Sequence, residues 1–251
     1  MPELTLLAAA AGVAVLLGAS LQSATGFGFG LLSGPLLFAA AGPQQAVGLL
    51  MVLGLEMNVL TLAGEGRRPQ PLRHDAVRLL AWAVPGSLFG VFVLRVLDEA
   101  TLQVLVTLGV LASLAVRRRR LRSSAAPSPP PRWAIPATGL AAGTLNTSTS
   151  ASGPPLVLYL LRRGARPAET RDTLTVIFLV HSLIGGLALA VTRTSGAIPE
   201  AVALAVLVPL VAVGHATGRR LFARLDAERY ELALTVTLVG AALAGLATVV
   251  W

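Results

Sequence analysis

Two polar stretches rich in glycine and proline interrupt the apolar sequence and decide the fold. The first reads Gln22-Ser23-Ala24-Thr25-Gly26-Phe27-Gly28-Phe29-Gly30 and is followed by Ser33-Gly34-Pro35. The second reads Asn146-Thr147-Ser148-Thr149-Ser150-Ala151-Ser152-Gly153-Pro154-Pro155. Glycine and proline fray or end helices, and inside a membrane the freed backbone groups must find partners or face a polar cavity. Each break therefore predicts a helix that stops within the membrane and a short helix that starts there.

The composition around the breaks is that of a membrane protein. Of the 251 residues, 55% are hydrophobic and only 13% are charged, and the mean hydropathy is +0.75, whereas soluble domains carry about 25% charged residues. Positions 4–55 hold no charged residue, and one crossing needs only about 20 residues. Cysteine is absent and the three histidines are far apart, so we predict neither a metal site nor another cofactor. The expected fold is all-α and polytopic, with about 8–10 transmembrane segments.

The chain divides into two repeats, residues 1–116 and 133–251, joined by a linker at 117–132 that is rich in arginine and proline. An offset of 124 relates Gln22 to Asn146, and an offset of 128 relates Gly86 to Gly214. The segments directly after the breaks, 29–41 and 153–161, are too short to span a membrane at 1.5 Å per residue. The expected long segments are 4–24, 44–63, 77–96 and 100–116 in the first repeat and 133–149, 173–192, 200–217 and 230–250 in the second.

Arginine positions predict the orientation. All 20 basic residues are arginine, and 18 of them fall between residues 67–78, 117–132, 162–171 and 219–229. By the positive-inside rule these stretches face the cytoplasm and both termini lie outside. The two repeats are then inverted, as in many secondary transporters, and the location is predicted to be a bacterial inner membrane. The arginines do not alternate with stacking aromatic residues, which argues against nucleic acid and leaves membrane lipid as their partner.

The broken hairpins predict the substrate site. A short helix that starts at a break points its N–H groups and the positive end of its dipole into the protein, which is an arrangement that binds anions. The predicted substrate-binding residues are Gln22, Ser23, Thr25, Gly26, Gly28 and Gly30 in the first break and Asn146, Thr147, Thr149, Ser152, Gly153 and Pro154 in the second. The alternative is that the glycines only allow helices to pack closely.

With these two breaks and two repeats, the chain resembles the sulfite exporter TauE/SafE family. The most similar stretch is Ser152-Gly153-Pro154-Pro155-Leu156-Val157-Leu158-Tyr159-Leu160-Leu161, and both halves open with a glycine-rich break and a short helix. Such families often have three consecutive glycines at the first break, where this chain has Gly26-Phe27-Gly28-Phe29-Gly30. The resemblance implies a permease or exporter, not an enzyme, whose substrate is a small anion such as sulfite or an organosulfonate.

Two ionisable residues inside apolar segments are candidates for proton coupling. Glu56 lies in the segment 44–63, and His181 lies at nearly the matching place in 173–192, where Ser182 matches Asn58 at the offset of 124. A carboxyl within a bilayer usually faces a cavity or a partner, and histidine can change charge near neutral pH. The alternative is a structural role for both. Arg95 and Arg193 lie near the predicted outer ends of their segments. Their side chains either reach the membrane surface or guide anions into or out of the protein.

The leading function is a secondary carrier that works by alternating access at the paired hairpins. The alternatives are an intramembrane serine hydrolase, built on Ser152 and His181, and an anion channel. No phosphate-binding lysine motif occurs, so ATP hydrolysis is not predicted. The glycine pairs Gly86/Gly90 and Gly214/Gly218 predict close helix-packing faces, either within one chain or in a homodimer.

Overall fold

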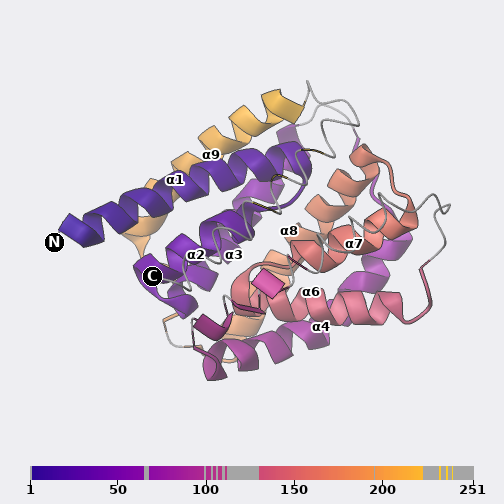
Figure 1. Ribbon diagram of the computed structural model, residues 1–251, viewed down its shortest axis with the longest axis horizontal. Coiled ribbons are helices and arrows are strands. Elements are labelled where there is room, and N and C mark those ends of the chain that lie inside the picture. The colour runs from indigo at the N-terminus through magenta and orange to yellow at the C-terminus, as the bar shows by residue number, and fades with distance from the viewer. Residues whose placement is uncertain are drawn as a thin grey trace.

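A computed structural model describes residues 2–64, 68–98, 130–194 and 196–222, scattered positions between 100 and 111, and positions 232, 236 and 239. Every regular element in these residues is a helix (Figure 1). Most of the predicted segment 100–116, the linker 117–132 and the segment 230–250 lies outside the described residues. The helices are α1 (Pro2–Thr25), α2 (Phe29–Ala41), α3 (Pro43–Gly64), α4 (Arg73–Val96), α6 (Ala134–Thr149), α7 (Gly153–Arg163), α8 (Pro167–Val191) and α9 (Ala201–Phe222).

Glycine and proline set the ends of the short helices. Helix α2 has the bounds that the sequence predicts, and Gly42, with a φ of 78°, separates its end from Pro43 at the start of α3. Helix α7 begins at Gly153 and ends at Arg163, and Gly164, with a φ of 71°, follows it. Both helices are shorter than the length that a membrane crossing requires.

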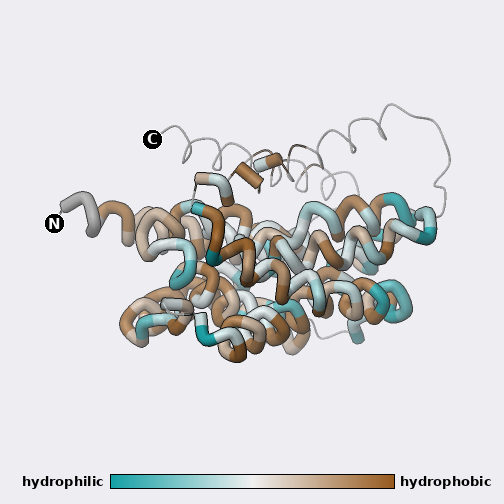
Figure 2. Tube along the Cα trace, turned by 90° about the horizontal axis from the view of Figure 1, so that it is seen from below, coloured by the Kyte–Doolittle hydropathy of each residue, from teal (hydrophilic) through white to brown (hydrophobic). Residues whose placement is uncertain are grey.

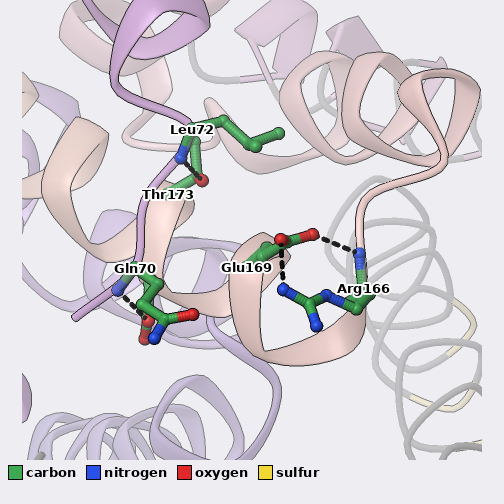
Figure 3. A network of polar contacts seen from close by, with 6 residues as sticks. Gln70, Leu72, Arg166, Glu169 and Thr173 are labelled. Carbon is green, nitrogen blue, oxygen red and sulfur yellow. Dashed lines mark hydrogen bonds and ion pairs between the residues drawn. The ribbon is translucent and has the colours of Figure 1, made fainter. Parts of the chain in front are cut away.

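Helix α8 begins six residues earlier than predicted. Pro167 occupies its first turn, where a missing N–H costs nothing. The backbone N–H of Arg166 donates to the Glu169 carboxylate at 3.0 Å, and the Arg166 guanidinium donates to the same carboxylate at 2.7 Å (Figure 3). These hydrogen bonds cap the first turn of α8, so the helix begins before the apolar segment 173–192 from which its start was predicted.

Helix length and surface composition confirm a multi-pass membrane protein. Within the described residues, five helices are long and apolar enough to cross a membrane. Large apolar side chains stand on the outside, with Phe92 59% and Leu187 64% exposed. In Figure 2 the hydrophobic colour runs along the helices and the hydrophilic colour gathers mainly near their ends. A surface of this kind needs lipid around it, so the predicted all-helical, polytopic class is confirmed.

Helices from opposite halves of the chain pair with each other. Helix α1 packs along α9, and α4 packs along α6 (Figure 1). A Cβ atom on Gly214 would lie 2.5 Å from the carbonyl oxygen of Leu16, and one on Gly86 would lie 2.4 Å from that of Leu140. Leu16 and Leu140 are related by the same offset of 124 that relates the breaks. The glycine faces are therefore used for packing inside the chain, at matching places in its two halves, while the inversion of the halves stays a prediction.

Two hydrophobic clusters divide the interior. One is formed mainly by α1, α2, α3 and α9, with the ends of α4 and α8. The other is formed mainly by α4, α6, α7 and the first half of α8. Helix α8 contributes to both, and the two breaks lie where the clusters meet.

Polar contacts also join the start of α8 to the segment that leads into α4 (Figure 3). The backbone N–H of Gln70 donates to the Asp172 carboxylate at 2.7 Å, and the backbone N–H of Leu72 donates to the Thr173 hydroxyl at 2.9 Å. Side chains of the second half thus satisfy backbone donors that precede a helix of the first half.

Candidate functional site

The two breaks share a left-handed residue at one matching position. In the first break Gly26 has a φ of 89° and Gly28 a φ of 112°, a region that glycine adopts at little cost. In the second break Ser150, which matches Gly26 at the offset of 124, has a φ of 57°. A left-handed residue at each matching position ends one helix and lets the next begin in a new direction.

The two breaks are in direct contact. A Cβ atom on Gly30 would lie 2.0 Å from the carbonyl oxygen of Ser150, which is closer than any real Cβ contact. From the other side, a Cβ atom on Gly153 would lie 3.0 Å from the ring of Phe27. The start of α2 therefore rests against the backbone of the second break, and only glycine allows this approach.

A small cavity lies between the breaks and the middle of α3 and α8. Its volume is about 40 Å³, which is room for about three water-sized groups. Among the described residues that line it, none is charged. Its polar lining consists of Gln22, Asn58, Asn146, Ser150, Ser152 and Ser182.

Matching residues of the two halves face this cavity together. Gln22 and Asn146, Gly28 and Ser152, and Asn58 and Ser182 all line it, and the members of each pair are 124 residues apart. The cavity thus lies where the sequence repeat relates one half of the chain to the other.

Gln22 ties the first break to α3. Its side-chain amide donates to the Asn58 oxygen at 3.2 Å, and its own oxygen accepts the backbone N–H of Phe29 at 3.2 Å. The first N–H of α2 is therefore satisfied by a cavity-lining side chain. The N–H groups of Gly30 and Leu31 come next, and a helix offers no internal acceptor to donors at these positions.

The start of α7 differs from the start of α2. Pro154 and Pro155 follow Gly153, and proline has no N–H. Helix α7 therefore presents fewer backbone donors than α2 does. The residues before the two helices also differ, since Gly28 has a φ of 112° and Ser152 a φ of −71°.

The structure brings only part of the predicted site to the cavity. Gln22, Gly28, Gly30, Asn146, Ser152 and Gly153 line it. The hydroxyl of Thr149 donates to the Leu145 carbonyl of its own helix at 2.8 Å, and that of Thr147 donates to the Ser87 carbonyl at 2.7 Å. The hydroxyl of Thr25 donates to the Leu21 carbonyl at 2.8 Å. The remaining predicted residues, Ser23, Gly26 and buried Pro154, are not among the residues that line the cavity.

Three polar lining residues, Asn58, Ser150 and Ser182, were not predicted as part of the site. The repeat relates Asn58 to Ser182, and Asn58 stands one helical turn after Gly54, which also lines the cavity. The missed signal was thus a pair of polar residues at matching positions in the two middle helices.

The coupling candidates lie at different distances from the cavity. His181 is 1% exposed, and its Nδ1 lies 3.3 Å from the hydroxyl of Ser152, which lines the cavity. Glu56 lies two residues from both Gly54 and Asn58, so it points away from the face that they form. Its Oε2 is buried without a hydrogen-bond partner among the described residues.

Arg171 corrects the sequence analysis, which placed it in the arginine-rich stretch 162–171, outside the apolar segments. Because α8 begins at Pro167, Arg171 lies inside this helix and is 0% exposed. Its Nε donates to the Ser23 carbonyl at 2.8 Å, where the C-terminal end of α1 favours a cation. The matching residue of the first repeat is Val47, so the repeat gave no signal for this arginine.

We expect Arg171→Met to destabilise the protein by about 1–3 kcal/mol, because the buried Ser23 carbonyl loses its charged donor. The measurement is thermal unfolding of the purified protein in detergent. Arg220→Met is the matched control, since Arg220 is exposed near the end of α9. Equal stability of the two variants would contradict a structural role for the Arg171 contact.

The contact between Ser152 and His181 is the geometry on which the hydrolase alternative depends. At 3.3 Å it is longer than a usual hydrogen bond between a nucleophile and its base. Ser152 also lines the cavity and His181 lies directly behind it, so the contact fits a binding site equally well. The choice between the two rests on relatives of the chain.

The comparison with known proteins makes that choice. The sequence pattern of the family described as sulfite exporter TauE/SafE matches residues 10–245. A protein from Cupriavidus necator named "Probable sulfite/organosulfonate exporter TauE" is 28% identical over 224 residues, which cover 83% of this chain and 82% of that protein. No solved structure matches the chain. The chain therefore belongs to the sulfite exporter TauE/SafE family and is a multi-pass membrane transporter, not an enzyme.

Proposed function

We propose that the chain is a secondary carrier that moves sulfite or a small organosulfonate across a bacterial inner membrane. The observation that supports it best is the central cavity, whose polar wall combines matching residues from both halves of the chain. The Cupriavidus necator relative is named as a probable sulfite/organosulfonate exporter, which supports both the class of substrate and outward transport.

The cavity wall suits an oxyanion that must be bound and then released. Ser152 and Ser182 line it with neutral hydroxyl groups, and the start of α2 adds backbone N–H groups at the positive end of a helix dipole. The Asn146 amide also lines it and donates to the His181 carbonyl at 2.9 Å. A transported ion must bind well enough to enter and weakly enough to leave, and neutral donors meet both needs. The volume of about 40 Å³ favours sulfite over a bulky sulfonate.

The packing supports alternating access. The cavity borders both hydrophobic clusters, since Phe29 and Leu50 belong to one and Leu31 and Ala151 to the other. Movement of one cluster relative to the other would expose the cavity first to one side and then to the other. In this proposal the arginine-rich ends face the cytoplasm and both chain termini lie outside.

Glu56 is proposed to couple transport to protons, because a carboxyl within a membrane helix is typical of proton-linked transporters. In proteoliposomes we expect saturable flux of labelled sulfite that a pH gradient stimulates, with sulfate, a short sulfonate and chloride as competitors. Glu56→Gln should lose the stimulation and keep the flux that needs no gradient. Glu200→Gln, which removes an exposed carboxylate, is the control.

Each other outcome has a distinct meaning. Stimulation that survives in Glu56→Gln would leave the carrier intact and contradict the role of Glu56. If the protein transports no sulfur oxyanion at all, the proposed substrate class is contradicted. Large single-channel currents would favour the channel, because a carrier moves only a few ions in each cycle.

A further inference from the structure

The two arginines that lie apart from the arginine-rich ends meet at one loop. Arg95 in the last turn of α4 donates to the Thr192 carbonyl, and also to the Thr194 hydroxyl at 3.0 Å. These two threonines flank Arg193 in the loop that follows α8. Arg95 and Arg193 come from opposite halves of the chain, and Arg95 holds the loop that presents Arg193.

Arg193 borders a second and much larger cavity. This cavity has a volume of about 570 Å³ and lies between α3, the end of α8 and the loop 192–199. Among the described residues that line it, Arg193 is the one charged side chain. Its φ of 49° is unusual for a residue other than glycine. A single cation in a mostly apolar recess attracts anions more strongly than one in open water.

Met51 separates this cavity from the central one. It is 5% exposed and lines both cavities. Its sulfur lies 3.8 Å from the Asn146 amide nitrogen and would lie 2.8 Å from a Cβ atom on Gly185. The side chain thus fills the space between α3, α6 and α8, and methionine is flexible enough to change its shape there.

We propose that the larger cavity is an anion vestibule of the transport path, on the side opposite the arginine-rich ends. Arg193 attracts the small oxyanion, Arg95 is a positioning residue for the loop, and Met51 is the partition between vestibule and central cavity. The proposal rests on the proposed function, since it assigns one end of the same path.

Among the described residues, no carboxylate lines the vestibule. The carboxylate of Asp98, which follows α4, accepts the backbone N–H of Thr101 at 2.8 Å. Glu200 lines a different cavity, which lies between α1, α2, α3 and α9. Arg193 therefore supplies the local charge of the vestibule wall.

The absence of native cysteine allows a direct test that needs no transport. Ser182→Cys places one thiol in the central cavity, and small anionic and cationic methanethiosulfonates are added to vesicles from the vestibule side. We expect the anionic reagent to react faster, and Arg193→Gln to reduce this preference about fivefold. Arg193→Lys should keep the preference, and so should Arg220→Gln, which removes a charge at the opposite end of the protein.

Met51→Ala should raise the reaction rates of both reagents at least tenfold by joining the cavities. Val52→Ala is the matched control, since Val52 lines the vestibule and is not among the residues that line the central cavity. In sulfite flux, Arg193→Gln should raise KM without lowering the maximal rate. A preference that survives Arg193→Gln would overturn the vestibule, and equal rates in the Met51 and Val52 variants would overturn the partition. If the thiol results hold while sulfite flux is absent, the proposed substrate fails and the vestibule stands.

Discussion

Gly30→Ala is expected to abolish transport. The added Cβ atom would lie 2.0 Å from the Ser150 carbonyl oxygen and 2.9 Å from the Ser150 carbonyl carbon. Backbone atoms cannot rotate away as a flexible side chain can, so α2 and the second break must separate. Overpacking of this kind costs about 1–3 kcal/mol, and here it displaces the cavity walls. We expect labelled sulfite flux in proteoliposomes to fall to the level of empty vesicles.

Gly34→Ala is the control for this substitution. Gly34 lies one turn further along α2, and its Cβ atom would meet the Thr149 carbonyl oxygen at an ordinary distance of 3.7 Å. Gly34→Ala should keep nearly full flux, because the same change in helix propensity occurs without a clash. Normal flux in Gly30→Ala would contradict the direct contact between the breaks, and loss of flux in both variants would point to a general sensitivity of α2.

Local sequence predicts most of the helix ends and of the break positions. Gly28, Gly42 and Gly164 are glycines at positive φ, and proline stands at the start of α3 and α8. These signals act through the backbone of one or two residues, so no knowledge of the tertiary structure is needed to interpret them. The bounds of α2 follow from them without error.

The direction of a side chain depends on contacts that the local sequence does not contain. A threonine in a membrane helix can donate to the carbonyl four residues before it, and Thr25 and Thr149 both do so. The same polar cluster therefore holds residues that line the cavity and residues whose hydroxyls bond nearby backbone carbonyls. Selecting the hydroxyl and amide residues of a break therefore selects more residues than those that line the cavity.

Arg171 was misplaced for a different reason. An arginine near other arginines at the end of an apolar segment is usually a topology signal, and three of its neighbours in 162–171 suggested the same interpretation. Its burial depends on the approach of α1, which lies 148 residues away in the chain. A contact between the two halves of the chain thus buries an arginine that the local sequence places among exposed ones.

The last prediction separates the cavity wall from the rest of the break. Gln22→Met keeps the length of the side chain but removes the acceptor of the Phe29 N–H and the donor to Asn58. Buried groups left without a partner cost about 1–3 kcal/mol, and each 1.4 kcal/mol corresponds to about tenfold in an equilibrium constant.

We therefore expect sulfite flux in Gln22→Met to fall at least about tenfold, with elution of the protein from a sizing column unchanged. Thr149→Val is the matched control, because it has nearly the same shape and loses only a hydroxyl bonded to its own helix. It should keep nearly full flux. Equal losses in the two variants would mean that the polarity of the whole break matters for transport. A loss in Gln22→Met alone would mean that the substrate meets only the side chains that face the cavity.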